Sequence, residues 1–588
     1  MLAFLRSVWI LSLLLALPQP VALRNVRADV PPDTKSPALR EELAAADQLY
    51  RAGKFAAAEA HYQALVKTDA QWLPAQLGLV RTMLREQKID EALETVNAAL
   101  AAQPNSATLL SEKGDVQFRR AEMSDAELSY LSAKKLDHNE VHSYLGLARV
   151  YAAYSFYRTA YGELQVAHAI AADNPDVQRA WLPTLPRRER LAALQTYLAR
   201  SHSSGSGQDD DDENKHMIEY LDFLKATIDT PGHACTLASK VEQTETRLET
   251  VHPENERRGW GLDEPRGIGL SASLNDRTIR LLLDTGAGGI IVSRTIAEKA
   301  GLTRISNVHF GGIGDQGLQS GYTAVADHVR IGELEFRDCL VTVSDGGAVA
   351  GGDGLIGADV FGSYLVDIDL PGERLKLSPL PKRPEDTIAP KSLNSEGEEP
   401  TDADQSENGA TEPAPDSNSS ARANGRNSFG AGPLSRPQPR DRYIAPEMAN
   451  WTKVFRFGHM ILVPTRVNDS KPMLFGLDTG AFSNILSLRA ARQVAKVGSD
   501  YRDRVVGVSG SVNQVYSSKR ATLGFGHYRQ SNLGMITLDL STISFQAGTE
   551  VSGFLGYAML RKLEVRLDYR DGLVDFEYDP KRDHGLRK

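Results

Sequence analysis

Hydrophobic positions recur with two different periods along the chain. Between residues 36 and 199, Ala and Leu recur at helical spacing, as in "QKIDEALETVNAAL", which predicts amphipathic helices. Later, apolar and polar residues alternate in "YLVDIDLPGERLKLSPL" and "LEVRLDYRDGLVDFEY". This alternation predicts β-hairpins that turn at Pro371-Gly372 and Asp571-Gly572. We therefore expect an all-α part followed by a mostly β part with short helices.

The helical part is internally repeated. The segments "GKFAAAEAHYQAL", "QKIDEALETVNAAL", "EMSDAELSYLSA" and "SFYRTAYGELQVA" align so that Ala58, Ala92, Ala126 and Ala160 recur every 34 residues. This period resembles that of the tetratricopeptide repeat, which implies a solenoid of helical hairpins over 36–200 with a concave surface for a protein or peptide partner. A spacer or dimerisation arm is the alternative reading.

Two breaks divide the chain further. "SSGSGQDDDDENKH", residues 203–216, combines small residues with a run of like charge, which predicts a solvated linker over 201–230. Between Lys382 and Arg442 the only large apolar residues are Ile388, Leu393, Phe429 and Leu434. That composition predicts a disordered linker over 382–442, between β-rich blocks at 231–381 and 443–588.

The N-terminus has the pattern of a secretory signal. Arg6 precedes the apolar run "VWILSLLLAL", and Val26 and Ala28 form a cleavage pair, which predicts a signal peptide over 1–28 and export to the periplasm or the medium. An uncleaved N-terminal anchor is the alternative, and no later apolar run is long enough to span a membrane. In an oxidising compartment Cys235 and Cys339 either pair or remain two buried thiols, and their spacing does not decide between these states.

Charge and motifs exclude several classes of function. The net charge of −9 gives no electrostatic reason to expect nucleic acid. Neither a His-Glu-x-x-His pattern nor a Cys-rich zinc pattern occurs, so we expect no metal and no cofactor. "GIGDQG" and "GDGLIG" fit a dinucleotide-binding pattern, but neither lies in a βαβ unit.

The chemistry points instead to a duplicated Asp-Thr-Gly motif. "IRLLLDTGAGGIIVS" and "MLFGLDTGAFSNILS" place Asp284 and Asp478 after apolar strands. A Gly-rich segment begins 27 residues after Asp284 and 29 after Asp478. "GLIG" then ends 73 residues after the first Asp and "GFLG" 78 after the second. One small β-domain is therefore present twice.

Two adjacent carboxylates suit peptide hydrolysis. Hydrolysis without a metal or a nucleophilic side chain needs a base for water and an acid for the carbonyl oxygen. Two neighbouring carboxylates do not both ionise, so Asp284 and Asp478 would hold one proton and supply both roles if the two copies of the β-domain bring them together. Gly286 and Gly480 let backbone N–H groups approach the carboxylates.

These landmarks resemble the aspartic peptidase superfamily in its retropepsin-like branch, over about 231–380 and 443–578. The resemblance implies two all-β lobes that form one active site, with Asp284 and Asp478 catalytic and Thr285, Gly286, Thr479 and Gly480 in the active-site loops. The threonine hydroxyls are expected to link the loops across the lobes. Flaps are expected over the site, with these candidate residues: Gly312, Ile313, Gly314, Val508 and Ser509.

The sequence thus predicts an exported, retropepsin-like aspartic endopeptidase that activates water with an Asp dyad, acts on a protein or peptide and recruits a substrate or partner through its helical repeats. Alternatives are a catalytically silent binding scaffold, or lobes that pair between chains. Ala287 and Ala481 follow the two triplets where pepsin-like relatives have a hydroxyl donor. Since a lost donor raises carboxylate pKa values, we expect a pH optimum nearer neutral than that of pepsin.

Overall fold

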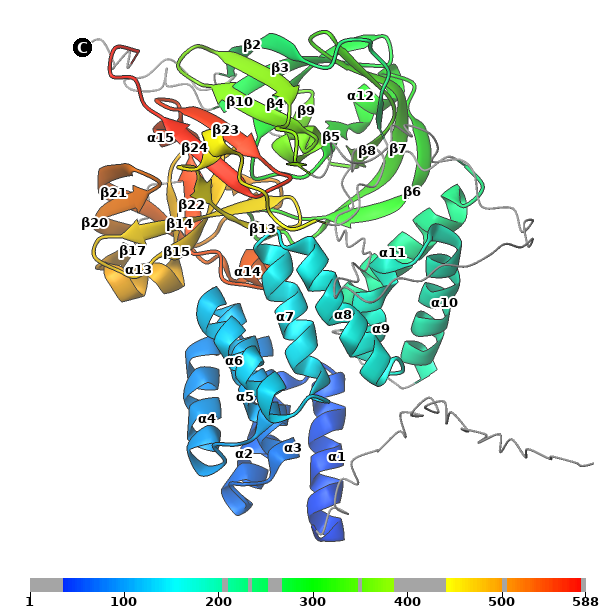
Figure 1. Cartoon of the computed structure of the whole chain (residues 1–588), viewed down its shortest axis with the longest axis vertical. Coiled ribbons are helices and arrows are strands. Elements are labelled where there is room, and N and C mark those ends of the chain that lie inside the picture. The colour runs from blue at the N-terminus through cyan, green and yellow to red at the C-terminus, as the bar shows by residue number, and fades with distance from the viewer. Residues whose placement is uncertain are drawn as a thin grey trace, which may run out of the picture.

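The computed structural model describes residues 35–203, 210–230, 235–251, 267–346, 352–384, 440–499 and 505–582. The predicted signal peptide at 1–28 lies outside these residues, as does the greater part of the predicted linker at 382–442. The helical repeats form one end of the molecule and the β-rich part forms the other (Figure 1). None of the described helices combines the length and apolarity needed to cross a membrane.

The repeats are antiparallel helices packed through small residues. Ala58, Ala92, Ala126 and Ala160 are all buried. A Cβ at Gly78 would lie 2.2 Å from the Tyr62 ring, so neighbouring helices approach closely only because this residue has no side chain. The helices are α1 (Pro37–Arg51), α2 (Phe55–Thr68), α3 (Leu73–Arg85), α4 (Ile89–Ala102), α5 (Ala107–Arg119), α6 (Met123–Leu136), α7 (Val141–Ala153), α8 (Tyr157–Ala171), α9 (Pro175–Trp181), α10 (Arg187–Ser203) and α11 (Asp210–Thr227).

The linker prediction for 201–230 is wrong for residues 210–227, which form α11. Leu221 and Leu224 of α11 are buried against Leu194 and Leu198 of α10. These apolar residues follow the acidic run at helical spacing, so the pairing of two helices outweighs the like-charge signal on which the linker prediction rested.

The first lobe contains β1 to β11 and the second contains β12 to β24. The first-lobe elements are β1 (Thr236–Leu237), β2 (Thr244–Val251), β3 (Gly267–Leu274), β4 (Arg277–Asp284), β5 (Ile290–Ser293), α12 (Arg294–Lys299), β6 (Thr303–Phe310), β7 (Gln319–Ile331), β8 (Leu334–Ser344), β9 (Gly354–Gly357), β10 (Tyr364–Asp369) and β11 (Arg374–Pro379). The second-lobe elements are β12 (Thr452–Lys453), β13 (Phe455–Phe457), β14 (Met460–Val467), β15 (Met473–Asp478), β16 (Ile485–Ser487), α13 (Leu488–Val494), β17 (Val497–Ser499), β18 (Val506–Gly507), β19 (Gly510–Ser511), β20 (Tyr516–Phe525), β21 (Tyr528–Leu538), α14 (Ser541–Ala547), β22 (Gly553–Gly556), α15 (Tyr557–Leu560), β23 (Glu564–Asp568) and β24 (Leu573–Glu577).

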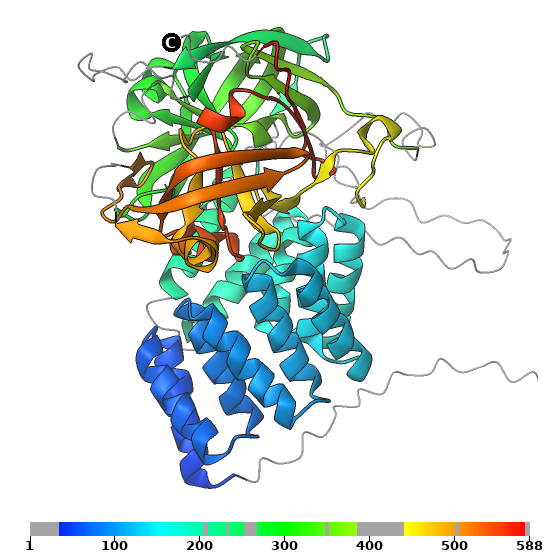
Figure 2. The ribbon, with the colours of Figure 1, turned by 90° about the vertical axis from the view of Figure 1, so that its left-hand side faces the viewer.

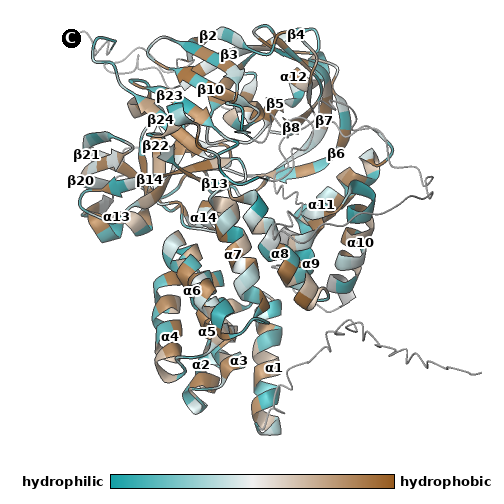
Figure 3. Ribbon diagram, in the orientation of Figure 1, coloured by the Kyte–Doolittle hydropathy of each residue, from teal (hydrophilic) through white to brown (hydrophobic). Residues whose placement is uncertain are grey.

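Both lobes place their Asp-Thr-Gly loop by the same strand arrangement. The strand that ends in the Asp pairs in parallel with the downstream apolar-apolar-Gly strand: β4 with β9, and β15 with β22. Asp284 is opposite Gly357, and Asp478 is opposite Gly556. Strands β9 and β22 are buried along their whole length, which accounts for their apolar sequence. In Figure 3 the strands at the centre of the lobes are largely hydrophobic, whereas the repeat helices carry alternating bands.

A shared sheet joins the two lobes. The strand order β12-β24-β23-β10-β11-β2 continues into the first lobe, and β10 pairs antiparallel with β23, with Val366 opposite Leu567. The hairpins predicted at Pro371-Gly372 and Asp571-Gly572 are the pairs β10–β11 and β23–β24. The two lobes of one chain therefore hydrogen-bond to each other along their strands.

The helical repeats pack directly on the second lobe (Figure 2). Phe118 of α5 and Leu147 of α7 share one hydrophobic cluster with Leu474 and Val551 of the second lobe. Hydrogen bonds to the end of α5 also fix the interface, because the Thr549 hydroxyl donates to the Phe118 carbonyl at 2.6 Å. The repeats are therefore a packed part of the molecule.

Cys235 and Cys339 form a disulfide. The bridge ties the segment before β1 to β8 and closes a loop with a sequence separation of 104 residues. Of the two states that the sequence left open, the structure has the bridged one.

Candidate active site

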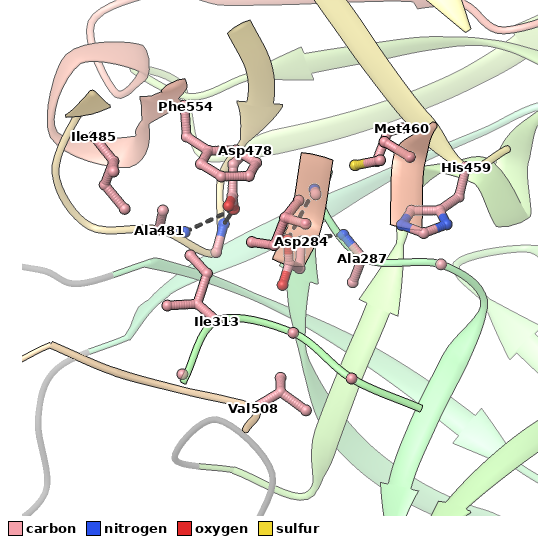
Figure 4. A pocket seen from close by; sticks show the side chains of 18 of the residues that line it. Asp284, Ala287, Ile313, His459, Met460, Asp478, Ala481, Ile485, Val508 and Phe554 are labelled. Atoms are coloured by element: carbon pink, nitrogen blue, oxygen red, sulfur yellow. Dashed lines mark hydrogen bonds between the residues drawn. The ribbon is translucent and has the colours of Figure 1, made fainter. Parts of the chain in front are cut away.

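The two Asp-Thr-Gly loops meet at the interface between the lobes. Figure 4 shows Asp284 and Asp478 side by side in one cavity. The Asp284 Oδ1 atom accepts hydrogen bonds from the backbone N–H groups of Gly286 at 2.9 Å and Ala287 at 3.2 Å. Asp478 Oδ1 accepts the same pair from Gly480 at 2.9 Å and Ala481 at 2.8 Å. Each carboxylate is thus oriented by its own loop.

The two threonines link the loops reciprocally. The Thr285 hydroxyl donates to the Leu477 carbonyl at 2.8 Å and accepts from the Thr479 N–H at 3.0 Å. The Thr479 hydroxyl donates to the Leu283 carbonyl at 2.6 Å and accepts from the Thr285 N–H at 3.1 Å. Both side chains are buried, so these bonds are shielded from water and hold the two loops in register.

The two glycines allow the carboxylates to come together. A Cβ at Gly286 would lie 2.7 Å from the Cγ atom of Asp478, and a Cβ at Gly480 would lie 2.4 Å from the Cγ atom of Asp284. The glycine of each loop therefore lies against the carboxylate of the opposite lobe. Any side chain at these positions would separate the pair.

Burial raises the pKa of both carboxyl groups. At Asp284 the backbone N–H groups of Gly286 and Ala287 act against this increase. At Asp478 the charge of Asp284 adds to burial, and the pKa lies well above the usual value. The pair therefore retains a proton at a higher pH than an isolated aspartate does. The missing hydroxyl donors at Ala287 and Ala481 also predict raised pKa values, but the main cause of the increase is burial.

Two loops cover the dyad and touch at their tips. The first flap is the loop at 311–318 between β6 and β7, and the second flap is the β18–β19 hairpin at 506–511. Ser509 N–H donates to the Ile313 carbonyl at 3.0 Å, and the Ser509 hydroxyl accepts from Gly312 N–H at 3.0 Å. The flap candidates from the sequence, Gly312, Ile313, Gly314, Val508 and Ser509, therefore lie together, with Ile313 and Val508 facing the dyad in Figure 4.

Other groups beside the dyad do not follow from the sequence motif. His459, in the β13–β14 turn of the second lobe, lies against Gly288, where a Cβ would be 2.9 Å from the His459 Cγ atom. Asp359 accepts a hydrogen bond from Gly289 N–H at 2.9 Å, and burial raises its pKa. Because Asp359 lies in the motif "DGLIGADVF", its position near the dyad could have been predicted. No pattern around His459 in the sequence indicates that its side chain lies near the dyad.

Comparisons with known proteins find matches to two parts of the chain. Residues 270–360 match the family model of the aspartyl protease, and residues 49–111 match that of the tetratricopeptide repeat. The chain thus combines an aspartyl protease domain with tetratricopeptide repeats. Asp284 lies within the matched segment, and Asp478 lies beyond it.

The curated relatives match over a short segment. The chain is 35% identical over 104 residues to DNA damage-inducible protein 1 of Neurospora crassa, covering 17% of this chain and 23% of that protein. It is 31% identical over 111 residues to the UBA domain-containing protein Mud1 of Schizosaccharomyces pombe, covering 18% of this chain and 32% of that protein. The chain therefore spans less than a third of the length of these relatives.

Two solved structures are similar to part of this chain. A thermophilic TPR protein of Thermus thermophilus has 24% identity and a TM-score of 0.24, covering 27% of this chain and 90% of that one. MamA of Desulfovibrio magneticus has 15% identity and a TM-score of 0.20, and the match covers 23% of this chain and 77% of that one.

Proposed function

We propose that this chain is an exported aspartic endopeptidase whose single active site is built from both lobes. The observation that carries the proposal is the meeting of Asp284 and Asp478 in one cavity, locked by the reciprocal threonine hydrogen bonds. A silent scaffold has no chemical need for two buried carboxylates in contact, because burying them costs stability.

The reaction follows from one proton shared by two carboxyl groups. The ionised group takes a proton from water as the water oxygen attacks the peptide carbonyl carbon, and the protonated group gives its proton to the carbonyl oxygen. The tetrahedral intermediate then collapses. The dyad gives its proton to the amide nitrogen, the C–N bond breaks, and one hydroxyl of the intermediate returns its proton to the dyad as the carboxyl product forms. Because the dyad ends the reaction with one proton, it is regenerated in each turnover.

The remaining parts of the proposal rest on separate observations. A disulfide between Cys235 and Cys339 is typical of an oxidising compartment and supports export. A cavity of about 1790 Å³ exceeds the roughly 300–1,000 Å³ typical of small-molecule sites, which favours a polypeptide substrate. The shared sheet between β10 and β23 supports pairing of the lobes within one chain.

Peptide cleavage by the purified chain across about pH 3 to 8 tests this function, with Asp284→Asn and Asp478→Asn as variants. We expect each variant to lose activity by roughly 10²–10⁴-fold, since acid–base catalysis contributes about that much. The optimum is expected nearer neutral than that of pepsin because both pKa values are raised.

Asp469→Asn is the matched control, because Asp469 is an exposed aspartate in the turn between β14 and β15. Measurement of the mass in solution shows whether the active species is a monomer. Cleavage that survives in both dyad variants, or an optimum confined to strong acid, would contradict the proposal.

A further inference from the structure

The helical repeats form part of the wall of the active-site cavity. The cavity that contains Asp284 and Asp478 is also lined by Phe118, Arg119 and Arg149 from α5 and α7. On the protease side of the same region lie Ile543 and Gln546 of α14. A polypeptide that lies in this cavity therefore has both the dyad and the repeats within its reach.

Arg119 is held at this wall by the second lobe. Its carbonyl accepts a hydrogen bond from Glu550 N–H at 3.0 Å, which fixes the end of α5. Its guanidinium donates to the Phe545 carbonyl at 3.4 Å and lies 5.2 Å from the centroid of the Phe545 ring. The side chain is thus positioned before any ligand arrives.

Within the described part of the chain no carboxylate forms an ion pair with Arg119, and the charge of Asp115 only partly opposes the factors that lower its pKa. The nearby acids have other partners: Asp115 pairs with Arg149, and Glu550 pairs with Arg489. Arg85 is also close, 5.2 Å from the same Phe545 ring. Burial first, and then the charges of Arg149 and Arg85, lower the pKa of Arg119.

A partly buried cation among other cations is unfavourable without a counter-ion. A carboxylate from a ligand would relieve this repulsion and would accept the N–H groups of the guanidinium in a charge-assisted pair. Asp284 and Asp478 lie in the same cavity and together carry negative charge. They therefore repel an acidic residue at the scissile bond, so the carboxylate of the peptide must lie elsewhere along the cavity.

We propose that Arg119 forms a subsite for a carboxylate of the bound polypeptide, so that the helical repeats select substrates with an acidic group at a fixed distance from the cleaved bond. This inference rests on the proposed function in one respect, namely that the cavity binds a polypeptide. The repeats then act in specificity as part of the cleft itself, in addition to any partner that their outer surface binds.

The test measures peptide binding by the full chain in an Asp284→Asn background, where no turnover consumes the ligand. The probes are fluorescent peptides of about ten residues, roughly 33 Å long when extended, built on one neutral host sequence. Glu replaces Gln at each position in turn, and each peptide is made with a free or an amidated C-terminus. The two series distinguish an acidic side chain from a C-terminal carboxylate.

We expect one Glu position, or the free C-terminus, to tighten binding by about 10-fold, the factor that corresponds to one charge-assisted hydrogen bond. Arg119→Gln should abolish that preference while leaving the affinity for the neutral host unchanged, and Arg119→Lys should restore part of it. Arg40→Gln, which removes an exposed arginine of α1, is the matched control and should keep the preference.

Equal affinity for acidic and neutral peptides would overturn the subsite, as would a preference that persists in Arg119→Gln. If Arg119→Gln also loses the neutral host, the Arg119→Lys variant decides, because a folded protein with a cation at this position must regain the preference. Cleavage by the chain with an intact dyad is scored separately. Selective binding without any cleavage would leave the subsite standing and would reject the endopeptidase.

Discussion

At the scale of single residues, burial of the Asp284–Asp478 pair works against the stability of the fold. Asp478 is only 8% exposed, and its carboxylate receives two backbone N–H donors. These donors offset part of the cost of burying a charge, yet the raised pKa shows that burial and the charge of Asp284 outweigh them. Ionisation of this group at neutral pH therefore works against the folded state.

This cost is measurable as a stability difference. A carboxyl group whose folded pKa is raised contributes stability that is fully present below its unfolded pKa, near 3.9, and that is lost as pH rises through the folded pKa. Asp478→Asn carries no charge and keeps an oxygen for the Gly480 and Ala481 N–H groups. We expect it to melt a few degrees above the wild type at pH 7, since roughly 2–4 °C corresponds to 1 kcal/mol in a folding unit of about 150–250 residues.

Thermal unfolding at pH 7 and at pH 4, beside the exposed-site control Asp469→Asn, checks this expectation. The difference in melting temperature should shrink as pH falls toward and below the unfolded pKa, because the Asp478 carboxyl group is then protonated in the folded and in the unfolded state. A variant that melts below the wild type at pH 7 would show that the carboxylate stabilises the fold instead.

The residues of the site differ in how far the sequence could reveal them. Asp284, Thr285 and Gly286 are adjacent in the chain, so their motif was readable, and its second copy strengthened the reading. His459 and Arg119 reach the cavity through contacts between the lobes and between repeats and lobe. Such contacts depend on tertiary packing, which leaves no local pattern in a sequence.

At the scale of elements, the two flaps are unequal partners. The first flap is carried by the long pair β6–β7, whereas the second is a hairpin of two-residue strands. Gln316 N–H of the first flap donates to the Ser509 carbonyl of the second at 2.9 Å. Closure over the dyad therefore depends on backbone hydrogen bonds between the tips.

Gly314 makes this contact sterically possible. Its φ is +136°, and a Cβ would lie 2.2 Å from the carbonyl carbon of Ser509. We expect Gly314→Ala to separate the flap tips and to lower kcat/KM by about 10²-fold, as a misplaced element near the reacting groups can. The global melting temperature should change by less than about 2 °C because a loop tip contributes few core contacts.

Gly317→Ala is the matched control for this prediction. Gly317 has a φ of +70°, so the variant carries a similar left-handed strain, but no atom lies within 4 Å of the added Cβ. Steady-state kinetics of both variants distinguish the steric clash of the added Cβ with Ser509 from the effect of backbone strain alone. Equal losses of kcat/KM in the two variants would contradict the role of the flap contact.

The elements also show where a sequence pattern misleads. The repeat helices follow from periodicity, because each buries one regular face. The strands around each Asp-Thr-Gly motif follow from their continuous apolar runs, because most of their positions are buried. Helix α11 was not predicted, because the acidic run at its start masked the helical spacing of the apolar residues Leu221 and Leu224. The second flap was weakly marked because a two-residue strand contains too few positions to establish a period.

At the scale of the whole molecule, both ends of the segment between the lobes are held at one buried carboxylate. Asp571 is fully buried and binds Arg383 on the near side of the segment. On the far side it accepts from Tyr443 N–H at 2.9 Å, and its carbonyl accepts from Arg442 at 2.7 Å. The lobes are in addition joined through β10 and β23.

Covalent continuity between the lobes is therefore not needed once the chain has folded. We expect a chain cut at a protease site engineered between residues 385 and 439 to elute as one species, with both fragments present and with the peptidase activity of the intact chain. Unfolding of the cut protein releases two chains, so its melting temperature should rise with protein concentration, whereas that of the uncut protein should not.

Removal of the anchor sharpens the same experiment. Asp571→Asn removes the buried charge that pairs with both Arg383 and Arg570, and breaking a buried pair costs about 3–5 kcal/mol. This variant should lower the melting temperature of the cut and the uncut protein, whereas Asp469→Asn should leave both unchanged. Separation of the wild-type fragments on gel filtration after cutting would mean that the peptide connection, rather than the shared sheet and the Asp571 anchor, holds the two halves of the active site together.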